Sequence, residues 1–211
     1  MNATHPQRQR AVQQRATDKI ARLLDATIEA LERDGEDGVR VAEICREVDV
    51  AYGTVYHHFG DRAGLIRAAQ LERLQRQPGV DIEAFRSALT GQPDAEDFVV
   101  QLLEICRNIA SPARGDVRLI RTSVIAGAQN DDTLRDEVTR LETEVMTNLV
   151  NVIDGAKQLG IADPSLDSLA LATYLSAVSY GLVLAEVNER KPDVDALAEV
   201  ILRGFAAFMP A

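Results

Sequence analysis

The chain has 211 residues, of which 46% are apolar, so it can bury a sizeable core in one large domain or two small ones. Trp is absent, Gly and Pro are sparse, and Ala, Leu, Arg and Glu dominate, which favours helices and argues against a sheet-rich fold. Two isolated cysteines, Cys45 and Cys106, exclude a disulfide framework and a cysteine-based zinc site. We therefore expect an all-α protein in which both thiols are buried as small hydrophobic groups.

The net charge of -10 is distributed unevenly along the chain. Residues 1–77 hold 12 Lys and Arg against 12 Asp and Glu, whereas residues 78–211 hold 11 against 21. The neutral first part opens with a local excess of positive charge, from Arg8, Arg10, Arg15, Lys19 and Arg22. We expect residues 1–17 to form a flexible basic arm, which either follows DNA phosphates or remains a solvated tail.

The first part of the chain contains four predicted helices. Apolar residues recur at helical spacing over residues 20–31, and glycines end this helix. Two short helices follow, over residues 41–48 and 52–59, and a tight turn joins them. The carboxylate of Asp61 can cap a fourth helix, which ends at a Pro-Gly pair. These helices predict a first domain over residues 18–77.

Residues 78–211 are predicted to form a larger helical domain. Five stripes of apolar residues recur there at helical spacing, and no segment alternates as a strand does. The stripes lie at residues 98–109, 117–127, 134–152, 171–185 and 197–208. No apolar run reaches the length of a membrane span, and residues 1–17 are too polar for a signal peptide. We therefore expect a cytoplasmic protein with no membrane partner.

The two short helices carry the pattern of a helix-turn-helix, in which the second helix enters a DNA major groove. Apolar residues at their crossing can hold the pair together: Ile44, Val48, Val50, Val55 and Phe59. The outer face of the second helix then presents hydroxyls and rings to phosphates and bases: Tyr52, Thr54, Tyr56, His57 and His58. Gly53 removes a side chain and lets the backbone approach the duplex. A plain helical hairpin would bury these rings, but so short a helix cannot turn all of them inward.

The run from Ile44 to Leu65 resembles the DNA-binding region of the TetR family of transcriptional regulators. The residues that match the family's core motif are Gly53, Thr54, Tyr56, His58 and Phe59. The likeness covers about residues 20–69, and length and helix layout extend it to the whole chain. It implies that Thr54, Tyr56 and His58 anchor phosphates, and that Tyr52 and His57 lie where base edges are read. Arg62 stands where the family usually has a lysine that reaches a phosphate.

Three residues depart from the family pattern without breaking it. Asp49 replaces the usual turn glycine, and aspartate tolerates the left-handed conformation better than most residues. Ala51 replaces a serine or threonine that would cap the recognition helix, at a cost of about 1 kcal/mol. Cys45 occupies the usual alanine position, where the two helices cross.

The resemblance also implies that residues 78–211 form a regulatory and dimerisation domain whose last two helices pair in a homodimer. Small residues would let these helices approach closely, and aromatic residues could fill the seam: Ala170, Ala177, Gly181, Ala185, Gly204, Phe205 and Phe208. The alternative is that these residues pack inside the monomer. Dimerisation also has a physical reason, because two recognition helices roughly 34–36 Å apart read a palindromic operator in double-stranded DNA better than one.

We expect an unidentified small-molecule effector to bind among the middle helices, and neither a cofactor nor a metal. The expected lining residues are Phe98, Leu102, Ile105, Cys106, Ile120, Arg121, Val124, Met146 and Tyr174. Polar residues interrupt this apolar pattern and could orient a ligand: Asn108, Arg121, Thr122 and Asn148. An ordinary core or surface position is the alternative for each. The apolar bias indicates a lipophilic or aromatic molecule.

These patterns predict a homodimeric repressor that an effector releases from its operator. An enzyme is a second class, but the adjacent His57 and His58 point about 100° apart on a helix and cannot share a metal. No nucleophile motif or phosphate-binding loop occurs, so we expect no catalytic residues. The third class is a helical protein-interaction scaffold that uses the Tyr/His surface without binding DNA.

Overall fold

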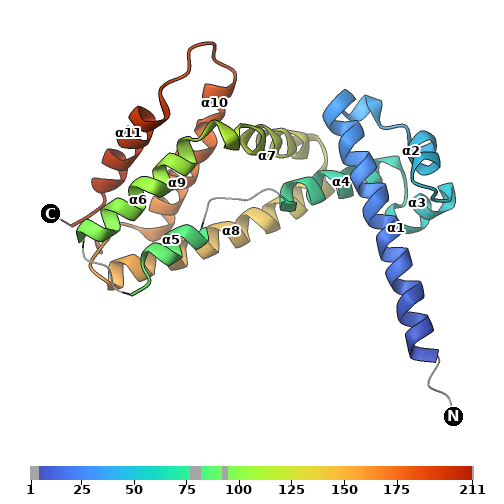
Figure 1. The fold of residues 1–211 in the computed structure, drawn as a ribbon, viewed down its shortest axis with the longest axis horizontal. Helices are drawn as coiled ribbons and strands as arrows, with labels where there is room; N and C mark the ends of the chain where they lie inside the picture. Colours follow the sequence, from blue (N-terminus) through green and yellow to red (C-terminus); the bar gives the residue numbers. More distant parts are fainter. Residues whose placement is uncertain (1–4, 77–81, 92–94, 211) are drawn as a thin grey trace. The chain divides into compact units, whose positions relative to one another are not determined.

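The computed structural model describes residues 5–76, 82–91 and 95–210. Within these ranges the regular secondary structure is helical and no strand occurs, which confirms the all-α prediction. The chain forms two compact units, Met1–Arg76 and Gln77–Ala211. The first holds the predicted helix-turn-helix, and the second is the larger helical unit (Figure 1).

The first unit contains α1 (His5–Asp34), α2 (Val41–Glu47), α3 (Tyr52–Phe59) and α4 (Arg62–Arg76), with the short 3-10 helix η1 (Glu36–Gly38) after α1. Helix α1 packs against α2 and α4, and α3 packs against α2 and α4 (Figure 1). Their shared core includes fully buried side chains from three of these helices: Leu23, Val55 and Leu65. This core holds α3 from behind.

Helix α1 begins much earlier than expected. Residues 5–17 are helical and continue α1, whereas we expected an arm separate from the first helix. The physical reason is composition: Gln, Arg and Ala are good helix formers, and extending an existing helix costs less than nucleating one. The side chains of Arg8, Arg10 and Arg15 lie outside the described part of the chain, so their contact with DNA stays a prediction.

The second unit is built from helices of very different length. They are α5 (Ile82–Ala88), α6 (Ala95–Ala110), η2 (Pro112–Arg114), α7 (Gly115–Gly127), η3 (Ala128–Asn130), α8 (Asp132–Gln158), α9 (Ser168–Gly181), α10 (Val183–Glu186) and α11 (Val194–Ala206). Three of them begin at an aspartate whose carboxylate accepts a hydrogen bond from a backbone N–H in the first turn: Asp131, Asp167 and Asp193. The five predicted apolar stripes fall on the five long helices α6, α7, α8, α9 and α11, whereas α5 was not predicted.

Helix α6 lies along α11, and α8 lies along α9 (Figure 1). The main core of the unit is made by α5, α6, α8 and α11, with Cys106 fully buried and Phe205 7% exposed. A smaller cluster between α8 and α9 contains Leu149, Ile153 and Ala172. Phe205, which we considered for a dimer seam, therefore packs inside the monomer.

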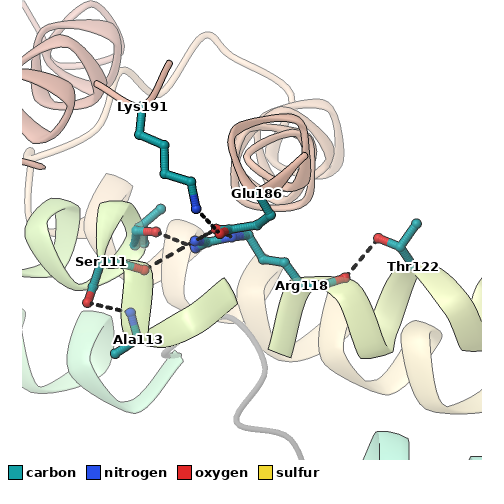
Figure 2. A network of polar contacts seen from close by, with 7 residues as sticks. Ser111, Ala113, Arg118, Thr122, Glu186 and Lys191 are labelled. Carbon is teal, nitrogen blue, oxygen red and sulfur yellow. Dashed lines mark hydrogen bonds and ion pairs between the residues drawn. The ribbon is translucent and has the colours of Figure 1, made fainter. Parts of the chain in front are cut away.

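A buried arginine ties α7 to α10 (Figure 2). The Arg118 Nε donates to Glu186 Oε1 at 3.0 Å, and Nη2 donates to the same carboxylate oxygen. Arg118 also donates to the carbonyl oxygens of Ile109 and Ser111, at 3.0 and 3.1 Å. Lys191 Nζ lies 3.6 Å from Glu186 Oε2. Only 6% of the Arg118 side chain and 12% of the Glu186 side chain are exposed, so this is a buried ion pair.

A second buried arginine joins α7, α8 and α9. The Arg121 Nη2 donates to Tyr180 Oη at 2.8 Å and to the carboxylate of Glu142. The Tyr180 hydroxyl donates to Glu142 Oε2 at 2.8 Å. The Arg121 Cζ lies 5.3 Å from the centre of the Tyr180 ring, within reach of a cation–π attraction. Burial of the phenol raises the pKa of Tyr180 to about 12, so it stays protonated as a donor.

Helices α9 and α10 are apolar although most of their residues are not buried in the chain. The segment Ser168–Glu186 is long and apolar enough to cross a membrane by length and composition, although only 17% of its most apolar window is buried. From the sequence we expected no apolar run of this length. It bends after Gly181, and its buried residues Leu171 and Ala172 contact α8 side chains. The exposed remainder is an apolar surface on a helix that also forms part of the core.

Candidate functional site

The turn between α2 and α3 has the geometry that a helix-turn-helix requires. Val48 N–H donates to Ile44 O at 3.1 Å and Val50 N–H donates to Cys45 O at 2.9 Å, which closes the end of α2. Asp49 has a φ of 53° and is the one non-glycine residue with positive φ in the described ranges. Asp49 thus occupies the left-handed conformation that glycine usually supplies. Ala51 stands at the N-cap of α3 and provides no side-chain hydrogen bond.

Helix α3 has one buried face and one exposed face. Val55 is completely buried, and Val48 and Phe59 pack against the same cluster from the sides. On the opposite face, Tyr52 is 48% exposed and Tyr56 is 51% exposed. Gly53, His57 and His58 are exposed as well, and Thr54 is half-buried. The rings predicted to meet DNA therefore project outward, as the helix-turn-helix interpretation requires.

The two tyrosines form a pair one helical turn apart. Their hydroxyl oxygens are 3.2 Å apart, and their ring centroids are 5.2 Å apart. The hydrogen bond to Tyr56 is the main cause that raises the pKa of Tyr52, so that phenol stays protonated near neutral pH. One hydroxyl donates to the other, and the proton of the accepting hydroxyl points elsewhere. The pair can therefore donate to a phosphate oxygen without losing its internal bond.

The two histidines stand beside this pair, on the last turn of α3. The rings of His57 and His58 are 5.0 Å apart with an interplanar angle of 84°, so they face in different directions. Among the described residues, no group of three or more His, Cys, Asp or Glu side chains could hold a metal ion.

Arg62 is used differently from our expectation. Its Nε donates to Val39 O at 3.0 Å, and its Nη2 donates to Glu36 O. Arg62 therefore fastens the segment between α1 and α2 to the start of α4, and its contact with a phosphate stays a prediction. Asp61 Oδ1 accepts a hydrogen bond from Gly64 N–H at 2.7 Å, which is the predicted cap of α4.

Sequence reasoning missed the role of Gly64. A Cβ at this position would lie 1.9 Å from the backbone oxygen of Phe59, so any other residue would push the end of α3 away from α4. Gly64 thus fixes how α3 is presented. The sequence offered one signal of this role, a glycine three residues after the aspartate that caps α4.

The second unit contains a cavity of about 80 Å³ between α5, α6, α8, α9 and α11. Every described residue that lines it is apolar, and four phenylalanines are among them: Phe85, Phe98, Phe205 and Phe208. The Tyr174 ring meets Phe208 edge to face at 5.1 Å. Such a cavity suits an aliphatic or aromatic group.

Comparison with known proteins identifies the family to which the region around α3 is similar. The sequence profile described as "Bacterial regulatory proteins, tetR family" matches residues 23–69, which run from α1 through the helix-turn-helix into α4. The chain belongs to the TetR family. This TetR-family chain is a DNA-binding transcriptional regulator, as the resemblance of residues 44–65 predicted.

Relatives resemble the chain over most of its length. It is 25% identical over 180 residues to the HTH-type transcriptional regulator UidR of Escherichia coli (strain K12), which covers 84% of this chain and 85% of that protein. It is 22% identical over 189 residues to the fatty acid metabolism regulator protein of Bacillus subtilis (strain 168), covering 87% and 92%. The solved structure of Salmonella enterica GusR has the same fold, with 22% identity, a TM-score of 0.64 and coverage of 90% and 96%.

Only some of the residues predicted to line an effector pocket in this TetR-family chain lie together. Phe98 and Leu102 line the cavity. Ile105 and Cys106 are buried in the core beside it, and burial raises the pKa of the Cys106 thiol to about 12. Ile120 and Val124 are buried residues of α7 that do not line the cavity.

The remaining predicted lining residues have other surroundings. Arg121 is held by Glu142 and Tyr180. Met146 packs against the α8–α9 cluster, and Tyr174 is 44% exposed. Thr122 donates to Arg118 O at 2.8 Å within its own helix.

The cavity residues that were missed come mainly from the second half of α8, and the others lie in or next to α5, α9 and α11. The apolar stripes of α8 and α11 were visible in the sequence, but their convergence with α6 depends on tertiary packing. Phe208 was assigned to a dimer seam, whereas it lines the cavity. No sequence pattern distinguished a place in a dimer interface from a place in the cavity lining for this residue.

Proposed function

We propose that this TetR-family regulator is a homodimeric, cytoplasmic repressor that binds a palindromic operator and releases it when a small-molecule effector binds. The observation that carries the proposal is the two-sided character of α3. Its Val55 side is completely buried in the first unit, whereas Tyr52 and Tyr56 on the other side are half exposed. A rigidly supported helix with exposed hydroxyls can enter a major groove.

In this proposal the residues of α3 divide into two roles. Thr54, Tyr56 and His58 hold phosphate oxygens and fix the orientation of the helix. Tyr52 and His57 face base edges, and Gly53 lets the backbone approach the duplex. Arg62 contributes mainly by fastening the segment that precedes α2, through its bonds to Val39 O and Glu36 O.

The proposed homodimer uses α9 to α11. Large apolar side chains are exposed there, and they would be costly to leave in water: Leu169, Tyr174, Leu184, Val187 and Val200. Ala170, Ala177 and Gly181 are exposed small residues on α9, which lets a partner helix approach closely. Burial of this surface in a partner copy accounts for an apolar segment, Ser168–Glu186, that is only slightly buried in one chain.

The proposed regulation is a shift between two states of the dimer. In one state the two recognition helices are wrongly spaced for the operator. An effector that binds this state more tightly lowers operator affinity, and the ratio of its affinities for the two states limits the size of the effect. The apolar cavity of the second unit is the proposed effector site, because its lining offers burial to an apolar group.

Selection of binding sites from random duplexes with the purified chain tests the proposal. We expect an enriched palindrome, bound with an affinity that falls steeply as salt rises. The Tyr56→Phe variant should bind it about 10- to 100-fold more weakly, because two hydroxyl–phosphate bonds per dimer are lost.

Thr143→Ala, which removes an exposed hydroxyl from α8, is the matched control and should leave the affinity unchanged. Failure to enrich any duplex, or equal affinity of wild type and Tyr56→Phe, would contradict the proposal.

A further inference from the structure

A second hollow adjoins the apolar cavity of the second unit. Its volume is about 290 Å³, close to the lower limit of about 300 Å³ for small-ligand sites. Leu89 and Val152 line both spaces, so the two hollows adjoin at these two side chains. Leu89 follows the end of α5 and is half-buried.

The two hollows differ sharply in polarity. The described residues around the first are all apolar, whereas the lining of the second includes the polar residues Arg86, Thr90 and Asn151. Arg86 Nη1 donates to Glu83 Oε2 at 2.6 Å, but a guanidinium has five N–H groups and can serve two carboxylates. Thr90 Oγ1 donates to Arg86 O at 3.2 Å, which keeps this hydroxyl at the edge of the hollow.

Gly155 leaves open space beside the α8 backbone at the polar hollow. It stands inside this long helix and lines the polar hollow, and no described atom lies within 4 Å of where its Cβ would be. Alanine would favour the helix and would fit, so the packing of the chain gives no reason for glycine. Gly64 and Gly115 differ, because a Cβ there would meet Phe59 O or Glu186 Oε2 at 1.9 and 2.9 Å. A bare stretch of helix backbone suits close approach by a ligand.

We propose that the effector is a single-chain amphiphile with a carboxylate head. Its aliphatic chain enters the apolar cavity past Leu89 and Val152, and its head lies over Gly155, where Arg86 and Asn151 donate hydrogen bonds. This inference deepens the proposed function, since it names the ligand class for the same effector site.

Titration calorimetry of the full chain with straight-chain carboxylates from hexanoate to dodecanoate tests the ligand class without DNA. We expect affinity to rise about 4-fold per methylene until the cavity is filled. Alcohols and alkylammonium ions of the same chain length should bind at least 10-fold more weakly than the carboxylate. Equal affinity for the three head groups, or no binding of any of them, overturns the proposal.

Two pairs of variants locate the ligand. Arg86→Gln should abolish the preference for carboxylate over alcohol, whereas Arg140→Gln should not; both arginines pair with a glutamate three residues earlier and are about half exposed. Gly155→Leu should fill the hollow and lower affinity at least 10-fold, whereas Gly155→Ala should fold at least as well as wild type and bind more tightly than Gly155→Leu. Full-strength binding by Gly155→Leu overturns the placement.

Operator release is measured separately, so the two proposals can fail independently. Carboxylate binding that leaves operator affinity unchanged supports the site and contradicts its regulatory role. Carboxylate binding by a chain that binds no duplex supports the ligand class and contradicts the proposed function.

Discussion

Replacing Glu186 with glutamine removes the carboxylate charge that faces the buried guanidinium of Arg118. Arg118 keeps its bonds to the carbonyl oxygens of Ile109 and Ser111, but its charge loses the compensating anion in a site where the arginine side chain is only 6% exposed. Removing one partner of a buried pair typically costs about 3–5 kcal/mol. Because Arg118 keeps two carbonyl acceptors, we expect Glu186→Gln to lose about 3 kcal/mol of stability, the lower end of that range.

Chemical and thermal unfolding followed by circular dichroism measure this loss. A destabilisation of about 3 kcal/mol lowers the Tm of a chain of this size by about 6–12 °C. Glu199→Gln is the matched control, because Glu199 pairs with Arg203 on the surface and such a pair contributes at most about 1 kcal/mol. The double variant Arg118→Met with Glu186→Leu should recover at least half of the loss, since neither charge remains buried.

The pH dependence supplies a second readout of the same pair. The hydrogen bond from Arg118 is the main cause that lowers the pKa of Glu186 in the folded chain. The pair therefore stabilises the fold fully above the unfolded pKa of a glutamate, about 4.3, and this stabilisation is lost as pH falls through the lowered folded value. Wild type and Glu186→Gln should converge in stability at acid pH. Equal stability of Glu186→Gln and Glu199→Gln at neutral pH would refute the reasoning.

Three further outcomes are expected from substitutions and labelling. Ala51→Ser should stabilise the first unit by about 1 kcal/mol in urea unfolding, because it adds the missing cap of α3; no gain would show that the cap geometry is wrong. Tyr180→Phe should destabilise the chain by about 2 kcal/mol, since Arg121 and Glu142 lose a shared buried hydroxyl, and an unchanged unfolding midpoint would contradict this. Cys106 should resist iodoacetamide at pH 8 in the native state, because burial raises the pKa of its thiol to about 12; rapid native labelling would contradict the structure.

The helix-turn-helix could be predicted from sequence because local signals agree there. The apolar positions Ile44, Val50 and Val55 define one face, the turn residue Asp49 accepts positive φ, and the rings that remain must then project outward. Each of these signals spans only a few residues. The first half of α1 was missed because its polar sequence lacks an apolar stripe, although its composition favours a helix.

The second unit was predictable as a set of helices but not as a packed arrangement. Helix α5 has only seven residues, so its periodicity carries little information. The spacing of apolar residues identifies the apolar face of a helix, but it does not show which other helix packs against that face. For that reason the expected lining residues include Phe98, which lines the cavity, and Ile120 and Val124, which do not; Phe208, which also lines it, was assigned to a different surface.

The central claim is that two copies of α3 enter one face of a duplex. Hydroxyl-radical footprinting of the selected operator measures this most directly. We predict two symmetric protected patches centred roughly 34–36 Å apart on one face of the DNA, both lost with Tyr56→Phe at a protein concentration that just saturates the operator with wild type. A single patch, or protection that Tyr56→Phe leaves unchanged, would contradict the account.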